Sequence, residues 1–223
     1  MRDRRKKYLA ERLEACADVL FSPDYDDRNF STAVLKPEYI DLEAYFGNRN
    51  PLMLEIGCGK GAFICEIAKR LPDVNFIAVE KVGNVLVMAC EKAKREGLRN
   101  ILFMKTDARM LPKYLPDHCV WRIFLNFSCP YPKHRDVNRR LTYDAFFPIY
   151  DRLLTEDGDI HQKTDNMHFF EYSLAQYPKN GYLIDNISLD LHHSDFEGNI
   201  VTEYEQRFSQ LGPIYRLEAR KMK

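Results

Sequence analysis

The chain has 223 residues and a formal net charge of zero, because 33 Lys and Arg side chains balance 33 Asp and Glu side chains. This length fits one α/β domain or two small ones. An apolar content of 45% with 13% aromatics is enough for a buried core, which excludes a globally disordered chain. The charge balance excludes a uniformly basic nucleic-acid binder.

The charge is nevertheless uneven along the chain. Residues 1–12 carry a net charge of +4, residues 133–140 carry +3 and residues 206–223 carry +4, whereas residues 155–205 carry −9. Local basic segments of this kind can contact nucleic acid even when the whole chain is neutral.

No membrane span or secretory signal is predicted. Apolar runs such as residues 85–90 are far shorter than the roughly 20 residues that a spanning helix needs, and the basic N-terminus has no apolar core behind it. The six cysteines form no Cys-x-x-Cys pair, so we expect reduced thiols and a cytoplasmic protein. No metal site is predicted, because the His192–His193 pair and Asp195 lack a further ligand cluster.

Short β-branched or aromatic runs alternate with longer amphipathic stretches, which is typical of a parallel sheet flanked by helices. In chain order we expect a helix at 8–20, an irregular segment at 21–50, strands at 51–57, 74–80, 101–105, 120–127 and 159–164, helices between them at 61–71, 84–96 and 141–154, a further helix at 167–175 that ends before Pro178, and late strands at 182–190 and 214–219. The pattern predicts a doubly wound, Rossmann-like α/β sheet, mostly parallel with an antiparallel edge strand and helices on both faces. It divides the chain into an N-terminal basic helix and approach segment, 1–50, and a main domain, 51–223.

Three glycines at every second position join the first main strand to its helix. Gly57, Gly59 and Gly61 permit a tight turn and let a ligand lie against bare backbone. Their spacing differs from both the dinucleotide fingerprint and the P-loop. Glu55 precedes the turn, and a carboxylate there suits a cationic ligand group better than a phosphate.

Two further acids follow the next two strands. Glu80 can accept hydrogen bonds from a ribose diol, and Asp107 can contact an adenine amine. A ligand with an ammonium, a ribose and an adenine but no phosphate is S-adenosylmethionine, so Glu55, Gly57, Gly59, Glu80 and Asp107 are predicted to bind it. The pattern resembles that of class I methyltransferases. An ordinary α/β turn with solvated acids is the alternative interpretation.

Four motifs follow in the second half of the chain: NFSCPYPK at 126–133, HRDVNRR at 134–140, HQKTDN at 161–166 and SDFEGNIVTEYE at 194–205. With the glycine turn, and in this order, they resemble the bacterial tRNA (guanine-N7-)-methyltransferase family over the whole chain. The resemblance implies a methyltransferase sheet, S-adenosylmethionine as cofactor, and transfer of its methyl group to N7 of a guanine in the tRNA variable loop, guanine-46 in the family. It also implies tRNA as partner, no membrane or metal, and a monomer or homodimer.

The resemblance assigns roles residue by residue. The substrate-pocket positions are Lys133, Asp165, Thr202, Glu203, Tyr204 and Glu205. The RNA-contacting positions are Arg135, Asp136, Val137, Asn138, Arg139 and Arg140. Cations here would neutralise phosphates, and Asp165 could accept from N1–H and the exocyclic amine of an unstacked guanine. A solvated helix start for the basic cluster, and a helix cap for Asp165, remain alternatives.

One motif departs from the family pattern. The family usually has Asp-Pro-Trp where this chain has Cys129-Pro130-Tyr131, so Cys129 stands at the position of a catalytic or cofactor-contacting acid. Guanine N7 carries a lone pair, so its methylation needs no general base. Alignment of N7 with the methyl group can therefore supply most of the lowering of the activation barrier. Loss of one carboxylate would cost on the order of 10²-fold. A weakened or inactive tRNA-binding homologue, and a methyltransferase for a small molecule or a protein, are the alternatives.

Overall fold

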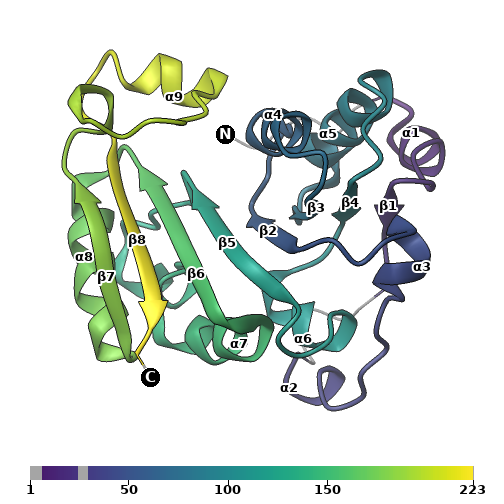
Figure 1. The fold of residues 1–223 in the computed structure, drawn as a ribbon, viewed down its shortest axis with the longest axis horizontal. Coiled ribbons are helices and arrows are strands. Elements are labelled where there is room, and N and C mark those ends of the chain that lie inside the picture. Colours follow the sequence, from purple (N-terminus) through teal and green to yellow (C-terminus); the bar gives the residue numbers. More distant parts are fainter. Residues whose placement is uncertain (1–6, 25–29, 223) are drawn as a thin grey trace. The chain divides into compact units, whose positions relative to one another are not determined.

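A computed structural model describes residues 7–24 and 30–222 (Figure 1). The chain forms two compact units, unit 1 (Met1–Pro116) and unit 2 (Asp117–Lys223), and each is described by itself. Residues 1–6 of the predicted N-terminal basic segment lie outside the described residues. The expected division into segments 1–50 and 51–223 stays a prediction.

Unit 1 contains a parallel group of strands. Its strands are β1 (Leu20–Phe21), β2 (Leu52–Ile56), β3 (Asn75–Val79) and β4 (Ile101–Met104), in the spatial order β1-β4-β3-β2. All three pairings are parallel. Every residue of β2, β3 and β4 is buried, which explains why these strands are nearly continuous apolar runs rather than alternating ones.

The helices of unit 1 are α1 (Leu9–Glu14), α2 (Phe30–Ala33), α3 (Leu42–Phe46), α4 (Ala62–Arg70), α5 (Gly83–Arg95), the 3₁₀ turn η1 (Ala108–Met110) and α6 (Leu111–Tyr114). α4 contacts β3 and α5, and α5 contacts β4. In α5, Leu86, Ala89, Cys90 and Ala93 recur at helical spacing and are fully buried. Gly97 follows the C-terminal end of this helix and has a left-handed φ of 69°.

The predicted helix at 8–20 is too long. It ends at Glu14, and β1 then pairs with β4, so that Phe103 N donates to Val19 O. The backbone N–H and C=O groups of β4 are available to pair with the segment around Leu20, which is buried there. The spacing of apolar residues in the sequence does not show this pairing. The segment at 21–50, expected to be irregular, contains two short helices, α2 and α3.

Unit 2 contains β5 (Val120–Asn126), β6 (Leu154–Thr164), β7 (Tyr182–Ser188) and β8 (Tyr215–Lys221), in the order β5-β6-β8-β7. β5 and β6 are parallel, whereas β8 is antiparallel to both neighbours. The expected antiparallel pairing of the two late strands is therefore confirmed, with the last strand inserted between β6 and β7. The carboxyl ends of β5 and β6 lie at the same end of unit 2 as α9 (Glu203–Phe208) (Figure 1).

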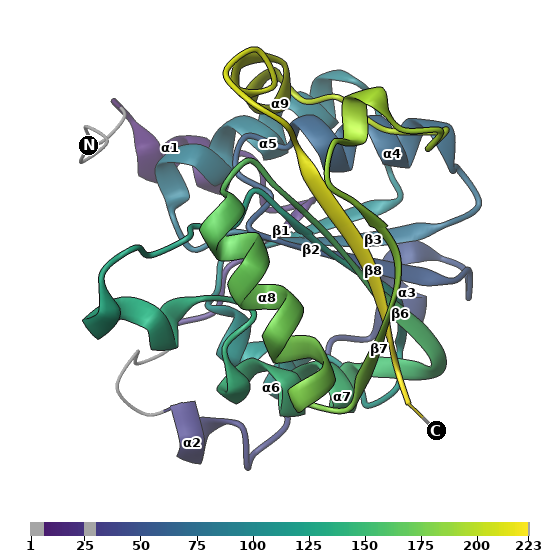
Figure 2. The same ribbon diagram turned by 90° about the vertical axis from the view of Figure 1, so that its left-hand side faces the viewer.

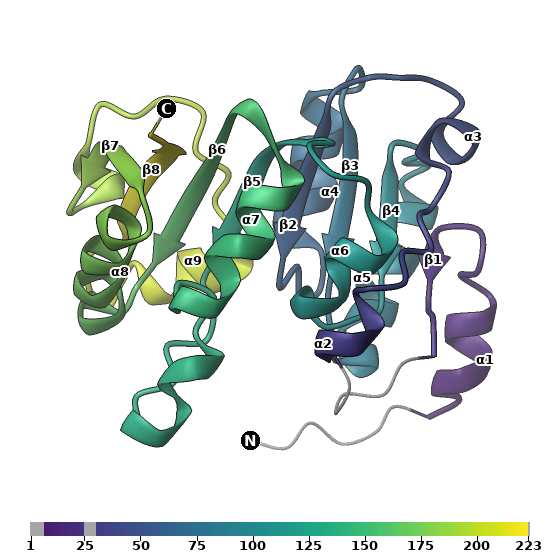
Figure 3. The same ribbon diagram turned by 90° about the horizontal axis from the view of Figure 1, so that it is seen from below.

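The other helices of unit 2 are η2 (His134–Arg139), η3 (Asp144–Phe146), α7 (Phe147–Leu153), α8 (Met167–Lys179) and η4 (Leu191–His193). α8 packs beside β7 and β8 (Figure 2 and Figure 3). The helix predicted over 141–154 begins only at Asp144, and β6 begins at Leu154, before the predicted start of that strand. α8 also runs through Pro178 instead of ending before it. Pro178 lacks the N–H that would donate to the preceding turn, and the helix continues for only one further residue, Lys179.

The third glycine of the turn packs against α5. Gly61 has a φ of 76°, and a Cβ added there would lie 2.7 Å from the Cβ of Ala89. By contrast, Gly47 has a φ of 68° and open space around the same position. A side chain at Gly61 therefore meets both backbone strain and a steric clash, whereas one at Gly47 meets strain alone.

Gly61→Ala is expected to lower the free energy of unfolding by about 2–4 kcal/mol, from left-handed strain together with overpacking. Gly47→Ala should cost only about 1–2 kcal/mol. Adding Ala89→Gly to Gly61→Ala removes the clashing Cβ and should recover part of the loss. Urea unfolding measures all three. Equal losses for the two glycine variants would contradict close packing at Gly61.

Candidate active site

The glycine turn is tied to the end of β3 and open on its other side. Gly57 N and Cys58 N donate to Val79 O at 2.8 and 3.0 Å. Gly57 and Gly59 have φ values of 87° and 55°, and a Cβ added at either has no described heavy atom within 4 Å. The backbone therefore offers a cradle that a ligand can approach closely, as the sequence predicted.

Glu80 holds the turn in relation to the next helix. Its Oε2 accepts from Gly59 N at 3.3 Å, and its Oε1 accepts from Val82 N at 2.8 Å, at the start of α5. Each carboxylate oxygen has two acceptor positions, so both can still accept from a ligand hydroxyl. The side chain therefore joins the glycine cradle to the position predicted for a ribose.

Glu55 lies on β2 and is buried, with 2% of its surface exposed. It pairs in the parallel ladder with Ala78 of β3, one position before the strand ends at Ile56. A carboxylate in such a low-dielectric position attracts a nearby cation more strongly than it would in water. The contact of Glu55 with a cationic ligand group stays a prediction.

Asp107 is ion-paired with two bases. Arg109 Nε and Nη2 donate to its two oxygens at 2.8 and 2.9 Å, and Lys81 Nζ lies 3.2 Å from Oδ2. Burial by itself raises the pKa of Asp107, but the hydrogen bonds and charges of Arg109 and Lys81 outweigh it and lower the pKa to about 2. The adenine-contacting role stays a prediction. The motif KTDAR carried the signal for Arg109, two residues after the acid.

In unit 2, Cys129 lies exposed in the loop that follows β5. Two non-glycine residues of this loop are left-handed, Phe127 with φ 50° and Tyr131 with φ 40°, which costs about 1–2 kcal/mol each. Burial raises the pKa of Tyr131 and of Tyr204, and Cys129 contributes to the rise at both hydroxyls. The thiol therefore lies near both rings, in a loop whose backbone is strained.

Arg140 holds this loop in place. Its Nε donates to Pro130 O at 2.8 Å and its Nη2 donates to Tyr131 O at 3.1 Å, while the guanidinium lies 4.4 Å from the ring centroid of Tyr172. A planar fork bonded to two adjacent carbonyls fixes a backbone turn. The sequence predicted an RNA contact for Arg140, and the structure gives its guanidinium this intramolecular role.

The other residues of the predicted RNA-contacting segment lie in η2. Arg135, Asn138 and Arg139 are exposed, and Asp136 and Val137 are half-buried. Lys133, which is predicted for the substrate pocket, precedes η2 and is exposed. Arg139 stacks over the Tyr131 ring at 4.4 Å and lies 3.6 Å from Asp136. The basic side chains of this segment, Arg140 apart, are therefore presented to solvent.

Asp165 follows the end of β6 and is half-buried. The cap of α8 is Asn166, whose side chain accepts from Phe169 N at 2.8 Å. Interpretation of Asp165 as the helix cap is therefore wrong. Its two oxygens instead lie 3.4 and 3.5 Å from the hydroxyl of Tyr204, a residue far along the chain.

The 202–205 positions divide into two kinds. Tyr204 and Glu203 are exposed, whereas Thr202 caps α9 by accepting from Glu205 N at 3.1 Å, and Glu205 is fully buried. Glu205 is ion-paired with Lys163 at 2.7 Å, which sequence reasoning missed. The motif HQKTDN contains this lysine, but nothing in the sequence shows that its ammonium is buried.

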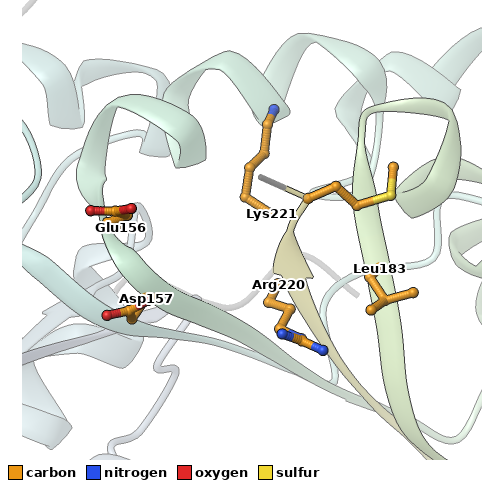
Figure 4. A pocket seen from close by; sticks show the side chains of 7 residues that line it. Glu156, Asp157, Leu183, Arg220 and Lys221 are labelled. Atoms are coloured by element: carbon orange, nitrogen blue, oxygen red, sulfur yellow. The ribbon is translucent and has the colours of Figure 1, made fainter.

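A separate cavity of about 460 Å³ lies at the other end of β6, between the first residues of that strand and the last residues of β8 (Figure 4). The side chains labelled around it are Glu156, Asp157, Leu183, Arg220 and Lys221. No sequence-predicted site residue lines it.

Two searches of the described residues gave negative results. In residues 7–24 and 30–222, no three His, Cys, Asp or Glu side chains gather as metal ligands would. Within the same ranges, no helix combines the length and the apolar character needed to cross a membrane.

The class of the protein is shown by a family model. A family model described as a putative methyltransferase matches residues 49–217. Among solved structures, the 16S rRNA methyltransferase KamB has a TM-score of 0.60 at 12% identity, covering 90% of this chain and 96% of that one. The antibiotic-resistance methyltransferase Kmr has a TM-score of 0.56 at 19% identity, covering 82% and 92%. These similarities confirm the Rossmann-like α/β fold.

Sequence relatives give the family. The tRNA (guanine-N(7)-)-methyltransferase of Streptococcus pneumoniae strain CGSP14 is 45% identical, over 98% of this chain and 99% of its own length. The protein of the same name from Listeria monocytogenes serotype 4a is 42% identical, over 99% and 98%. The chain belongs to the tRNA (guanine-N7-)-methyltransferase family and is an enzyme of that family, which confirms the resemblance.

The capping assignment predicts a contrast in stability between neighbours. Asn166→Ala should lower the free energy of unfolding by about 1 kcal/mol, because the Phe169 N–H loses its acceptor. Asp165→Ala should change it by no more than about 0.5 kcal/mol, as usual for a half-exposed side chain outside the cap. Thermal unfolding compares the two variants. A larger loss for Asp165→Ala would restore the capping interpretation.

Arg109→Gln should raise the pKa of Asp107 from about 2 toward the ordinary value of 3.8. Because the folded pKa lies below the unfolded one, wild-type Asp107 stabilises the fold above about pH 4 and loses this contribution as the pH falls toward 2. A ¹³C NMR titration of the Asp107 carboxyl carbon measures the shift, with Asp159 as an internal reference. An unchanged midpoint in Arg109→Gln would contradict the assignment.

Proposed function

We propose that this enzyme transfers a methyl group from S-adenosylmethionine to N7 of a guanine in the tRNA variable loop, guanine-46 by the resemblance. The observation that carries the proposal is the placement of Asp165. It lies at the carboxyl end of a parallel strand, it is not needed as a cap, and it faces Tyr204. Relatives of 42–51% identity are named for the same activity.

The residues of unit 1 fit S-adenosylmethionine, which supplies a methyl group on a sulfonium when bound. The donor set consists of carboxylates, Glu55, Glu80 and Asp107, which suit an ammonium, a ribose diol and an adenine amine rather than phosphates. The open faces of Gly57 and Gly59 leave room for such a ligand at the backbone. These side chains bind and orient the cofactor.

Asp165 selects the base. A carboxylate can accept from N1–H and the exocyclic amine of guanine, whereas the unprotonated N1 of adenine would be placed against it unfavourably. The nearby Tyr204 offers an aromatic face and a hydroxyl. Since guanine N7 carries its own lone pair, the residues need only align it with the methyl group, and no general base is required.

Cys129 stands where the family usually has an acid, and its thiol brings no comparable charge. Single electrostatic groups contribute on the order of 10²-fold, so the enzyme is proposed to be active but slower than with a carboxylate there. The relatives give no support to the alternative of an inactive tRNA-binding homologue.

The proposed partner is tRNA, met through the exposed cations Lys133, Arg135 and Arg139. Each phosphate neutralised releases counterions, so binding should weaken steeply with salt. We also propose a cytoplasmic location, together with the prediction of a monomer or homodimer.

The test is to map the modified nucleoside. Unmodified tRNA treated with the protein and methyl-labelled S-adenosylmethionine should yield labelled 7-methylguanosine from the variable loop. Asp165→Asn should lower kcat/KM roughly 10- to 100-fold, as expected for a lost charged hydrogen bond. Its dissociation constant for S-adenosylmethionine should stay within twofold.

Asn166→Ala serves as the matched control, because it alters the neighbouring cap and should keep near-normal kcat/KM at a temperature where it is folded. Label on another atom of the tRNA, or no transfer at all, would refute the proposed function. Normal activity of Asp165→Asn would refute the role of that residue.

A further inference from the structure

Lys163 carries a buried ammonium group near the carboxyl end of β6. Its side chain is 7% exposed. Its Nζ donates to Glu205 Oε2 at 2.7 Å, to Asn199 Oδ1 at 2.9 Å and to Ile200 O at 3.1 Å. All three acceptors belong to one segment, residues 199–205, so a single side chain fastens that segment to the strand.

Glu205 completes the network from the other side. Its side chain is 0% exposed, and its Oε1 accepts from Asn199 Nδ2 at 2.7 Å and lies 3.0 Å from His192 Nε2. A carboxylate buried in this way would have to break its ion pair to reach a ligand, at the cost of several kcal/mol for each uncompensated charge. The position that the resemblance assigns to the substrate pocket is therefore turned inward.

The Lys163–Glu205 ion pair is linked to three parts of the proposed site, namely the loop that carries Cys129, Asp165 and Tyr204. The carbonyl of Lys163 accepts from Phe127 N at 2.8 Å, at the start of the loop that carries Cys129. Asp165 follows Lys163 by two residues. Tyr204 precedes Glu205, and its ring centroid lies 5.0 Å from that of Phe127 and 4.2 Å from that of Phe208.

The segment that Lys163 fastens has little regular structure of its own. Between η4 and α9, residues 194–202 form neither helix nor strand, and residues 192–198 are exposed. A buried ion pair adds little net stability compared with an apolar pair, but it fixes geometry. The Lys163–Glu205 pair therefore joins the segment that carries Tyr204 to the strand that Asp165 follows.

We infer that Lys163 is a positioning residue for the guanine site, acting through Glu205 to hold Tyr204 against Phe127 and Asp165. The inference rests on the proposed function for its catalytic consequence, whereas its geometric part does not depend on the substrate. Phosphate contacts by other residues supply most of the tRNA affinity, so loss of Lys163 should act on kcat more than on KM.

The test is Lys163→Met, which keeps an unbranched side chain but removes the ammonium. We expect kcat for tRNA methylation to fall on the order of 10²-fold from misalignment, with KM for tRNA and the dissociation constant of S-adenosylmethionine within threefold. Lys179→Met is the matched control. That lysine pairs with Asp144 on the surface of the same unit, and its loss should leave kcat unchanged.

A second readout does not depend on activity. In Lys163→Met, amide hydrogen exchange over residues 199–208 should accelerate, and the nuclear Overhauser contact between the rings of Phe127 and Tyr204 should weaken. Asn199→Ala removes a side chain that bonds to both Lys163 and Glu205, but it leaves the ion pair between them intact. It should give a smaller acceleration of exchange and a smaller weakening of the ring contact. It decides the matter if Lys163→Met does not fold.

The outcomes separate the two proposals. Unchanged exchange and ring contact in the folded variants would overturn the positioning role, whatever the enzyme methylates. Accelerated exchange together with unchanged kcat would overturn the link to catalysis. If the wild-type protein yields no 7-methylguanosine, the proposed function fails, while altered ring contact in the variants would still support the geometric inference.

Discussion

Parallel strands end at the same edge of a sheet, and the glycine turn and four further predicted site residues of this protein, Glu80, Asp107, Cys129 and Asp165, follow such ends. In unit 1 the strands β2, β3 and β4 lead to the glycine turn, Glu80 and Asp107, and in unit 2 β5 and β6 lead to Cys129 and Asp165. Most side chains of the buried strands are apolar, with Glu55 of β2 an exception. Function is therefore concentrated in the turns that follow them, where backbone amides and side chains are accessible.

Charge is handled differently in the two units. In unit 1, the positive charges of Arg109 and Lys81 lie beside the carboxylate of Asp107. They lower its pKa, which keeps it ionised, and they offset its negative charge. In unit 2, Glu205 is buried and ion-paired with Lys163, whereas Asp165 is half-buried at the carboxyl end of β6. In unit 2 the paired Glu205 therefore fixes geometry, whereas the half-exposed Asp165 stays available to a ligand.

Sequence reasoning was most successful where a local rule was sufficient. Alternating strands and helices, the left-handed glycines and the acid at each strand end followed from spacing, and the structure agrees. It was least successful where a distant group decided the outcome. β1 depends on the backbone of β4, and Arg140 is drawn to the carbonyls of Pro130 and Tyr131 by the shape of the loop. In the sequence, an arginine that contacts RNA cannot be distinguished from one that, like Arg140, bonds to the carbonyls of its own chain.

The sequence by itself determined the α/β fold and the glycine turn, because these depend on periodicity and residue type, and it indicated the family through the resemblance of its ordered motifs. Only the tertiary structure decided which polar residues remain available. It gave the cap to Asn166 rather than Asp165, turned Glu205 inward to Lys163 and left Tyr204 exposed beside Asp165. The Lys163–Glu205 and Asp165–Tyr204 contacts join residues that are 42 and 39 positions apart in the chain, and no local pattern encodes such pairs.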